Sequence, residues 1–85
     1  MRNQHIWKTR TEEGVKREVR AVKFGGVWRI QSQLKGDAEW THHDPPLIED
    51  LIELRDVLFR KYQRRRAAYE DVVLIEKMIE ERNGV

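Results

Sequence analysis

The sequence predicts an α+β fold, in which an antiparallel meander of three or four strands is followed by a C-terminal helical segment packed on one face of the sheet. Two observations support this class. A glycine pair separates two stretches of alternating polar and apolar residues, a pattern typical of a β-hairpin. Further along, residues 47–82 contain no glycine or proline and carry apolar residues at helical spacing. We therefore expect the sheet at about residues 5–42 and the helical segment at about residues 45–82.

The hairpin is centred on Gly25 and Gly26, because glycine readily adopts the positive φ angles of a two-residue turn. This turn pairs Phe24 with Val27. Since neighbouring side chains on a strand point to opposite faces, the pairing separates the two faces of the sheet. The predicted core face carries Val19, Ala21, Trp28, Ile30 and Leu34. The predicted polar face carries Arg20, Arg29, Gln31, Gln33 and Lys35, together with Glu18.

Short strands are also expected on both sides of the hairpin. The stretch HIWKTRTEEGVK predicts a strand and a turn at Glu12–Gly14. After the hairpin, the stretch KGDAEW would turn the chain, and Ala38–His42 would add a short final strand. These additions make the meander three- or four-stranded.

The helical segment begins with a broad apolar stripe, but its continuation is open. In a single straight helix, Arg65 and Arg66 would fall inside the stripe, and the later apolar residues would be rotated by roughly a quarter turn or more. A break near Gln63–Ala67 removes this conflict. One long helix remains an option, because Ala67 and Ala68 favour helix and its far end could meet another subunit. The stripe consists of Leu47, Ile48, Leu51, Ile52, Leu54, Leu58, Phe59 and Tyr62. The residues expected to form one buried core are Trp28, Ile30, Leu34, Leu51, Leu58 and Tyr62.

The stretch THHDPP precedes this stripe and raises the question of a metal or acid–base site. Asp44 is a preferred N-cap residue, and the prolines after it suit a first helical turn. His42 and His43 would point to opposite faces of a strand, so they are poorly placed to bind one ion together. No recognised metal-ligand spacing and no nucleophile motif accompany them. We therefore predict that Asp44 caps the helix, that one histidine is exposed and the other partly packed, and that no residue is catalytic or metal-binding.

Length and composition narrow the function. At 85 residues, the chain predicts a single small domain with little room beside its core for an enzyme cleft. We expect no enzyme activity, no cofactor and no small-molecule substrate. The absence of cysteine fits a reducing cytoplasm, and neither a signal peptide nor a membrane-spanning run is visible. These features predict a cytoplasmic protein that does not associate with membranes.

The apolar tail favours protein binding. VVLI, followed by MI, covers every side of a helix, so this segment is buried on more than one side or forms an interface. VVLI could alternatively form a short strand, but the flanking residues favour helix. We expect a non-catalytic binding module that contacts protein, including a second copy of itself. The candidate protein interface is Val72, Val73, Leu74, Ile75, Met78 and Ile79.

Basic residues favour an alternative function, nucleic-acid binding. Residues 1–46 carry nine basic and six acidic residues, whereas residues 67–85 carry two and five. The run from Arg60 to Arg66 complements the dipole at a helix end, and it could instead bind phosphates. We do not expect Tyr62 to stack on bases, because the stripe places it in the core. The candidate nucleic-acid contacts are Arg20, Arg29, Gln31, Gln33, Lys35, Arg60, Lys61, Arg64, Arg65 and Arg66.

Overall fold

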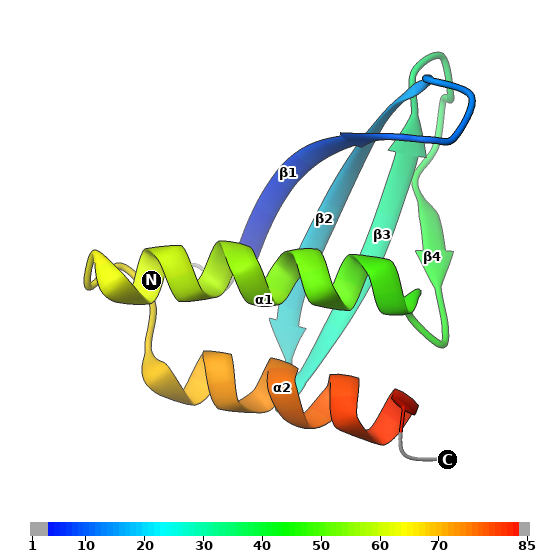
Figure 1. Ribbon diagram of the computed structural model, residues 1–85. Coiled ribbons are helices and arrows are strands. Elements are labelled where there is room, and N and C mark those ends of the chain that lie inside the picture. The colour runs from blue at the N-terminus through cyan, green and yellow to red at the C-terminus, as the bar shows by residue number, and fades with distance from the viewer. Residues whose placement is uncertain (1–3, 84–85) are drawn as a thin grey trace. The chain divides into compact units, whose positions relative to one another are not determined.

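The computed structural model describes residues 4–83 and confirms the predicted α+β class. A four-stranded antiparallel sheet is followed by two helices (Figure 1). The described residues form two compact units: a sheet unit that ends at Pro46 and a helical unit that begins at Leu47. Within these residues, neither helix is long and apolar enough to cross a membrane.

The sheet unit is an up-and-down meander. Its strands are β1 (Gln4–Arg10), β2 (Lys16–Phe24), β3 (Val27–Leu34) and β4 (Thr41–His43), and they lie in the order β1-β2-β3-β4. Each strand pairs with its neighbour in the chain in the antiparallel sense. The short final strand is therefore present, slightly later in the chain than the expected Ala38–His42.

The central hairpin has the predicted register. Phe24 pairs with Val27, and the turn residues Gly25 and Gly26 have φ angles of 58° and 76°. Both angles lie in the left-handed region, which explains why glycine occupies the two positions. Alternation along β2 and β3 buries the expected face. Its buried apolar residues are Val19, Ala21, Trp28 and Ile30.

Two residues of the sheet core differ from the prediction. Leu34 is 38% exposed, because β3 ends at this residue and the chain turns, with the Asp37 N–H donating to the Leu34 carbonyl. His5 on β1 is buried instead, and its ring centroid lies 5.5 Å from that of Trp28. Hydrophobic patterning does not detect this histidine, since the residue is polar. The indole N–H of Trp28 has no hydrogen-bond partner among residues 4–83.

The helical unit consists of two antiparallel helices that lie side by side, α1 (Ile48–Gln63) and α2 (Tyr69–Asn83) (Figure 1). The connection at residues 64–68 confirms the predicted break near Gln63–Ala67. Arg65 in this connection has a φ of 58°, so the backbone reverses through a left-handed residue. VVLI lies within α2, as expected. The buried apolar residues of the two helices are Leu51, Leu54, Leu58, Val72, Ile75 and Ile79.

The apolar stripe of α1 is narrower than predicted. Leu51 and Leu58 are fully buried, whereas Tyr62 is 39% exposed. Tyr62 lies one residue before the end of α1, where the chain leaves the helix axis. The predicted common core is therefore wrong at Leu34 and Tyr62. The other exposed residues of the stripe are Leu47, Ile52 and Phe59.

The predicted helix cap at Asp44 is wrong. Leu47 holds the N-cap position of α1, with φ and ψ of −70° and 138°, and no side chain caps the helix. Asp44 lies three residues earlier and forms no hydrogen bond with the first turn. Two consecutive prolines explain the shift. A residue that precedes proline is disfavoured from helical backbone, so the helix begins only after Pro46.

Candidate nucleic-acid interface

The polar face of the sheet gathers basic side chains from three strands. Directly paired residues of an antiparallel sheet project from the same side, so the register assigns each side chain to a face. We call the surface that results the basic face. It carries six basic residues and one acidic strand residue, Glu18, and the acidic Asp37 lies at its edge in the turn after β3. The six are Lys8, Arg10, Lys16, Arg20, Arg29 and Lys35.

All five of the sheet residues predicted as nucleic-acid contacts lie on this face. Gln31 pairs with Arg20, and Gln33 with Glu18. Lys35 follows β3 directly, and its backbone N–H donates to the Lys16 carbonyl over 2.9 Å. The register thus places arginine, glutamine and lysine side chains together on one surface.

Sequence reasoning missed three basic residues of this face on β1 and at the start of β2. They are Lys8, Arg10 and Lys16. The signal was the turn at Glu12–Gly14, which pairs Arg10 with Lys16. Counting back from this turn would have placed Lys8 opposite Glu18.

A polar network fixes the middle of the basic face. Both Nε and a terminal nitrogen of Arg20 donate to the Gln31 side-chain oxygen, the first over 2.9 Å. The Gln31 amide nitrogen lies 2.8 Å from Nδ1 of His42 on β4. The Arg20 guanidinium also stacks 4.3 Å from the Trp40 ring centroid. These contacts hold the arginine and the glutamine in set orientations.

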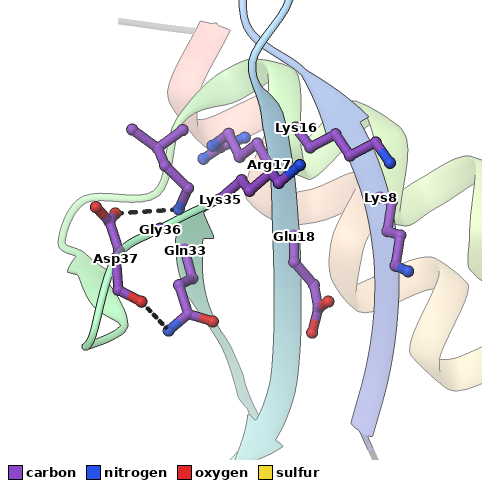
Figure 2. A pocket seen from close by; sticks show the side chains of 9 residues that line it. Lys8, Lys16, Arg17, Glu18, Gln33, Lys35, Gly36 and Asp37 are labelled. Atoms are coloured by element: carbon purple, nitrogen blue, oxygen red, sulfur yellow. Dashed lines mark hydrogen bonds between the residues drawn. The ribbon is translucent and has the colours of Figure 1, made fainter.

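The first hollow on this face lies near the end of the sheet (Figure 2). We call it the lysine hollow. Its volume is about 320 Å³. Figure 2 shows Lys8, Glu18 and Gln33 on three neighbouring strands, with Lys16 and Lys35 near the strand ends. The remaining lining residues are Arg17, Leu34, Gly36 and Asp37.

The lysines of this hollow form no close ion pairs with the residues that the structure describes. Among residues 4–83, no carboxylate oxygen forms an ion pair with Lys8, Lys16 or Lys35. The Asp37 carboxylate accepts from the Leu34 N–H over 3.1 Å and forms no ion pair with these lysines (Figure 2). The hollow therefore presents three ammonium groups to solvent.

The second hollow lies toward the hairpin turn. We call it the aromatic hollow. Its volume is about 350 Å³, and it is lined by Val22, Phe24, Arg29, Gln31 and His42. Phe24 is 68% exposed, and the Arg29 guanidinium lies 5.6 Å from its ring centroid. An exposed aromatic ring, a guanidinium and an amide thus share one depression.

The predicted basic run, Arg60–Arg66, belongs to the helical unit. Arg60 and Lys61 lie in the last turn of α1, and the three arginines Arg64, Arg65 and Arg66 lie in the connection to α2. The run thus belongs to the helical unit, whereas the basic face belongs to the sheet unit.

Tyrosines accompany this basic run. The rings of Tyr62 and Tyr69 lie 5.5 Å apart, and Phe59 lies 6.5 Å from Tyr62. All three aromatic side chains are exposed. The expectation that Tyr62 is sequestered in the core is therefore wrong, and an aromatic surface stands beside the arginines.

Some residues of the predicted protein interface on α2 are buried within this chain, and others are accessible. Val72 and Ile75 are buried in this chain, as is Ile79, whereas Val73 is 46% exposed. Leu74 and Met78 are half-buried. Only part of the apolar tail is thus accessible to a partner.

The two histidines of β4 lie as predicted, one exposed and one partly packed. His42 faces the basic face, and His43 faces the other side, where Nε2 lies 2.6 Å from the Ser32 hydroxyl. Within residues 4–83, no three histidine, cysteine or acidic side chains lie close enough to hold a metal ion. The histidines are therefore placed as partners of sheet side chains.

Comparison with known proteins gives no relative: the chain matches no protein-family model, no curated protein and no solved structure.

Proposed function

We propose that this protein is a non-catalytic nucleic-acid-binding module that holds phosphate groups on its basic face. The observation that carries the proposal is the assembly of six basic side chains on one face of the sheet, where Glu18 and Asp37 are the acidic side chains. Such a surface suits the phosphate backbone of a nucleic acid. Each phosphate that a basic side chain binds releases counterions from the nucleic acid, and this release favours binding.

The local charge of the basic face far exceeds that of the whole chain. The complete sequence has a net charge of +2, while this one face carries six basic groups against the two acidic groups of Glu18 and Asp37. Neither Lys8 nor Lys16 has a carboxylate partner among residues 4–83. The electrostatic potentials of the basic side chains add over the face, and the sum favours a ligand with many negative charges.

The dimensions of the face also suit a chain of phosphates. From Lys16 to Phe24, β2 extends for nine residues, which corresponds to about 26 Å at ~3.3 Å per step. A single phosphate would engage only one part of this length. Several phosphates in a row would engage all of it.

The test is a fluorescence-anisotropy titration with labelled oligonucleotides at several salt concentrations. A triple variant, Lys8→Gln, Lys16→Gln and Lys35→Gln, removes three phosphate contacts. The slope of log affinity against log salt should then become shallower by about 2–3 units. The charge-matched control replaces Arg55, Lys77 and Arg82 of the helical unit with glutamine.

The control variant should keep the wild-type slope, because its cations lie outside the basic face. Equal losses in both variants would mean that only net charge matters, and the proposed interface would be wrong. If the wild type binds none of the oligonucleotides at low salt, the proposed nucleic-acid-binding function is wrong.

A second candidate function is self-association through the helical unit. The specific observation is an exposed apolar surface made of Phe59, Tyr62, Tyr69 and Val73. Ring contacts connect the three aromatic residues, and Tyr69 and Val73 are four residues apart on one face of α2. An isologous dimer would cover both copies of this surface at once.

Sedimentation equilibrium over a wide concentration range tests this second function. We expect a monomer–dimer equilibrium that Val73→Glu abolishes, because the charge would be desolvated in the interface. The variant Leu74→Glu extends the test to a half-buried neighbour. A wild-type monomer at every concentration would eliminate self-association.

A further inference from the structure

We propose that the ligand of the basic face is a single-stranded nucleic acid, with a base in the aromatic hollow and phosphates at the lysine hollow. This inference rests on the proposed function and names its substrate class. It follows from the width of the face, from the chemistry of the aromatic hollow and from the spacing of the two hollows.

The width of the face argues against insertion into a duplex groove. Polar side chains cover all four strands, from Lys8 on β1 to His42 on β4. Adjacent strands lie about 4.8 Å apart, so the outer strand axes are separated by about 14 Å. The major groove of B-DNA is about 12 Å wide and admits a two-stranded ribbon. A single strand lying across the sheet meets no such limit.

The aromatic hollow offers the groups that hold an unpaired base. Phe24 is 68% exposed, although its side chain is large and apolar. Aromatic rings exposed within a basic surface are typical platforms for base stacking. The Arg29 guanidinium lies over this ring and can stack on the same base. In a duplex the faces of the bases are covered by their neighbours, so this ring would have no base to stack on.

Polar groups at the edge of this hollow can bind the edge of a base. The Gln31 amide uses its oxygen for Arg20 and its nitrogen for His42, which leaves one amide N–H for a ligand. The other ring nitrogen of His42, Nε2, has no partner among the described residues. A base stacked on Phe24 would thus meet hydrogen-bonding groups at its rim.

The two hollows lie along the same pair of strands. Val22 lines the aromatic hollow and Glu18 the lysine hollow, four residues apart on β2, which is about 13 Å. Between these two residues on β2 lies Arg20, which is paired with Gln31 at the edge of the aromatic hollow. One strand of nucleic acid can therefore place a base in the first hollow and nearby phosphates in the second.

The experiment compares four ligands of equal length by fluorescence anisotropy: single-stranded RNA, single-stranded DNA, a DNA duplex and an abasic DNA strand. The key variant is Phe24→Ala, whose exposed position at the turn leaves the core intact. Its fold is checked by circular dichroism. The abasic strand is the matched control, because it keeps the phosphates and removes every base.

We expect the wild type to bind single strands more tightly than duplex. Phe24→Ala should lose between about fivefold and 150-fold in affinity for the RNA or DNA strand. Its affinity for the abasic strand should equal that of the wild type. This pattern of affinities supports the inference whether it is found with RNA or with single-stranded DNA.

Two outcomes would overturn the inference and leave the proposed function standing. One is duplex binding that is as tight as single-strand binding. The other is an unchanged single-strand affinity in Phe24→Ala while the lysine triple variant still loses affinity. Failure of the proposed function differs from both, since no ligand of the four would then bind.

Discussion

The two basic regions of this protein arise in different ways. The run Arg60–Arg66 is contiguous in sequence and lies at the end of α1 and in the following connection. The basic face is scattered over residues 8–35 and is assembled by strand pairing. The helix dipole accounts for part of this run, because Arg60 and Lys61 lie in the last turn of α1 and acidic residues lie in its first turn. The basic face has no comparable role, and this is why we assign the ligand to it.

The largest expected effect is on the salt dependence of oligonucleotide binding, and it distinguishes the basic face from the run Arg60–Arg66. The variant Arg64→Gln, Arg65→Gln and Arg66→Gln removes as much charge as the lysine triple variant of the basic face. Oligonucleotide titrations should show a change in the salt slope of less than about one unit, against about 2–3 units for the lysine variant. The reason is that three separate phosphate contacts are lost only in the lysine variant.

Equal or greater losses in the arginine variant would reverse the assignment. The ligand would then contact the connection between the helices, where Tyr62 and Tyr69 are exposed. In that case, Tyr69→Ala should weaken binding and Phe24→Ala should not.

The next prediction contrasts buried and exposed residues on the same helix. Ile75 is fully buried on α2, and Val73 is 46% exposed. Ile75→Val removes one buried methylene group and should lower the free energy of unfolding by about 0.5–1.5 kcal/mol. Val73→Ala should change it by at most about 0.5 kcal/mol. Urea denaturation followed by circular dichroism measures both values.

Both variants should bind oligonucleotides with wild-type affinity, because neither residue lies in the sheet unit. If Val73→Ala greatly lowers the free energy of unfolding in a sample that sediments as a dimer, an interface at the exposed surface around Val73 would be supported instead.

Strand pairing explains how much the sequence could predict. The hairpin register followed from the glycine pair alone, since the turn fixes every pair from Phe24–Val27 to Val19–Ser32. The helix break also followed, because Arg65 and Arg66 could not enter an apolar stripe. Both inferences rely on local periodicity, which a single sequence contains.

Other features could not be predicted from the sequence, for physical reasons. Lys8 joins the basic face only through the pairing of β1 with β2, a contact between strands that the alternation within a single strand does not contain. Trp40 approaches Arg20 from a segment outside the strands, so no alternation places it. His5 is a polar residue in the sheet core, and hydrophobic patterning does not identify such residues.

A smaller effect is expected at the acidic residue of the basic face. Glu18 lines the lysine hollow and pairs with Lys8 across the strands. Its carboxylate repels a phosphate there, so Glu18→Gln should tighten oligonucleotide binding by about two- to fivefold at low salt. The difference should shrink as salt rises, because exposed charges are screened.

The isosteric glutamine keeps the shape of the hollow, so the comparison isolates charge. Weaker binding by Glu18→Gln would show that the carboxylate accepts a hydrogen bond from the ligand, or that it orients a lysine. The lysine hollow would then hold a base edge instead of a phosphate.

The smallest expected effect concerns Asp44, which lies before α1 and is compared with Asp50 in its first turn. Asp44 matches the sequence pattern of an N-cap, yet Leu47 occupies that position. Asp44→Ala should therefore change the free energy of unfolding by no more than about 0.5 kcal/mol. Asp50 is buried in the first turn, where a carboxylate interacts favourably with the positive end of the helix dipole, and Asp50→Ala should cost about 1–2 kcal/mol. Thermal and urea denaturation of the two variants measures this difference. A loss of about 1 kcal/mol or more in Asp44→Ala, with little change in Asp50→Ala, would mean that α1 begins before Pro46 in solution and that Asp44 caps it after all.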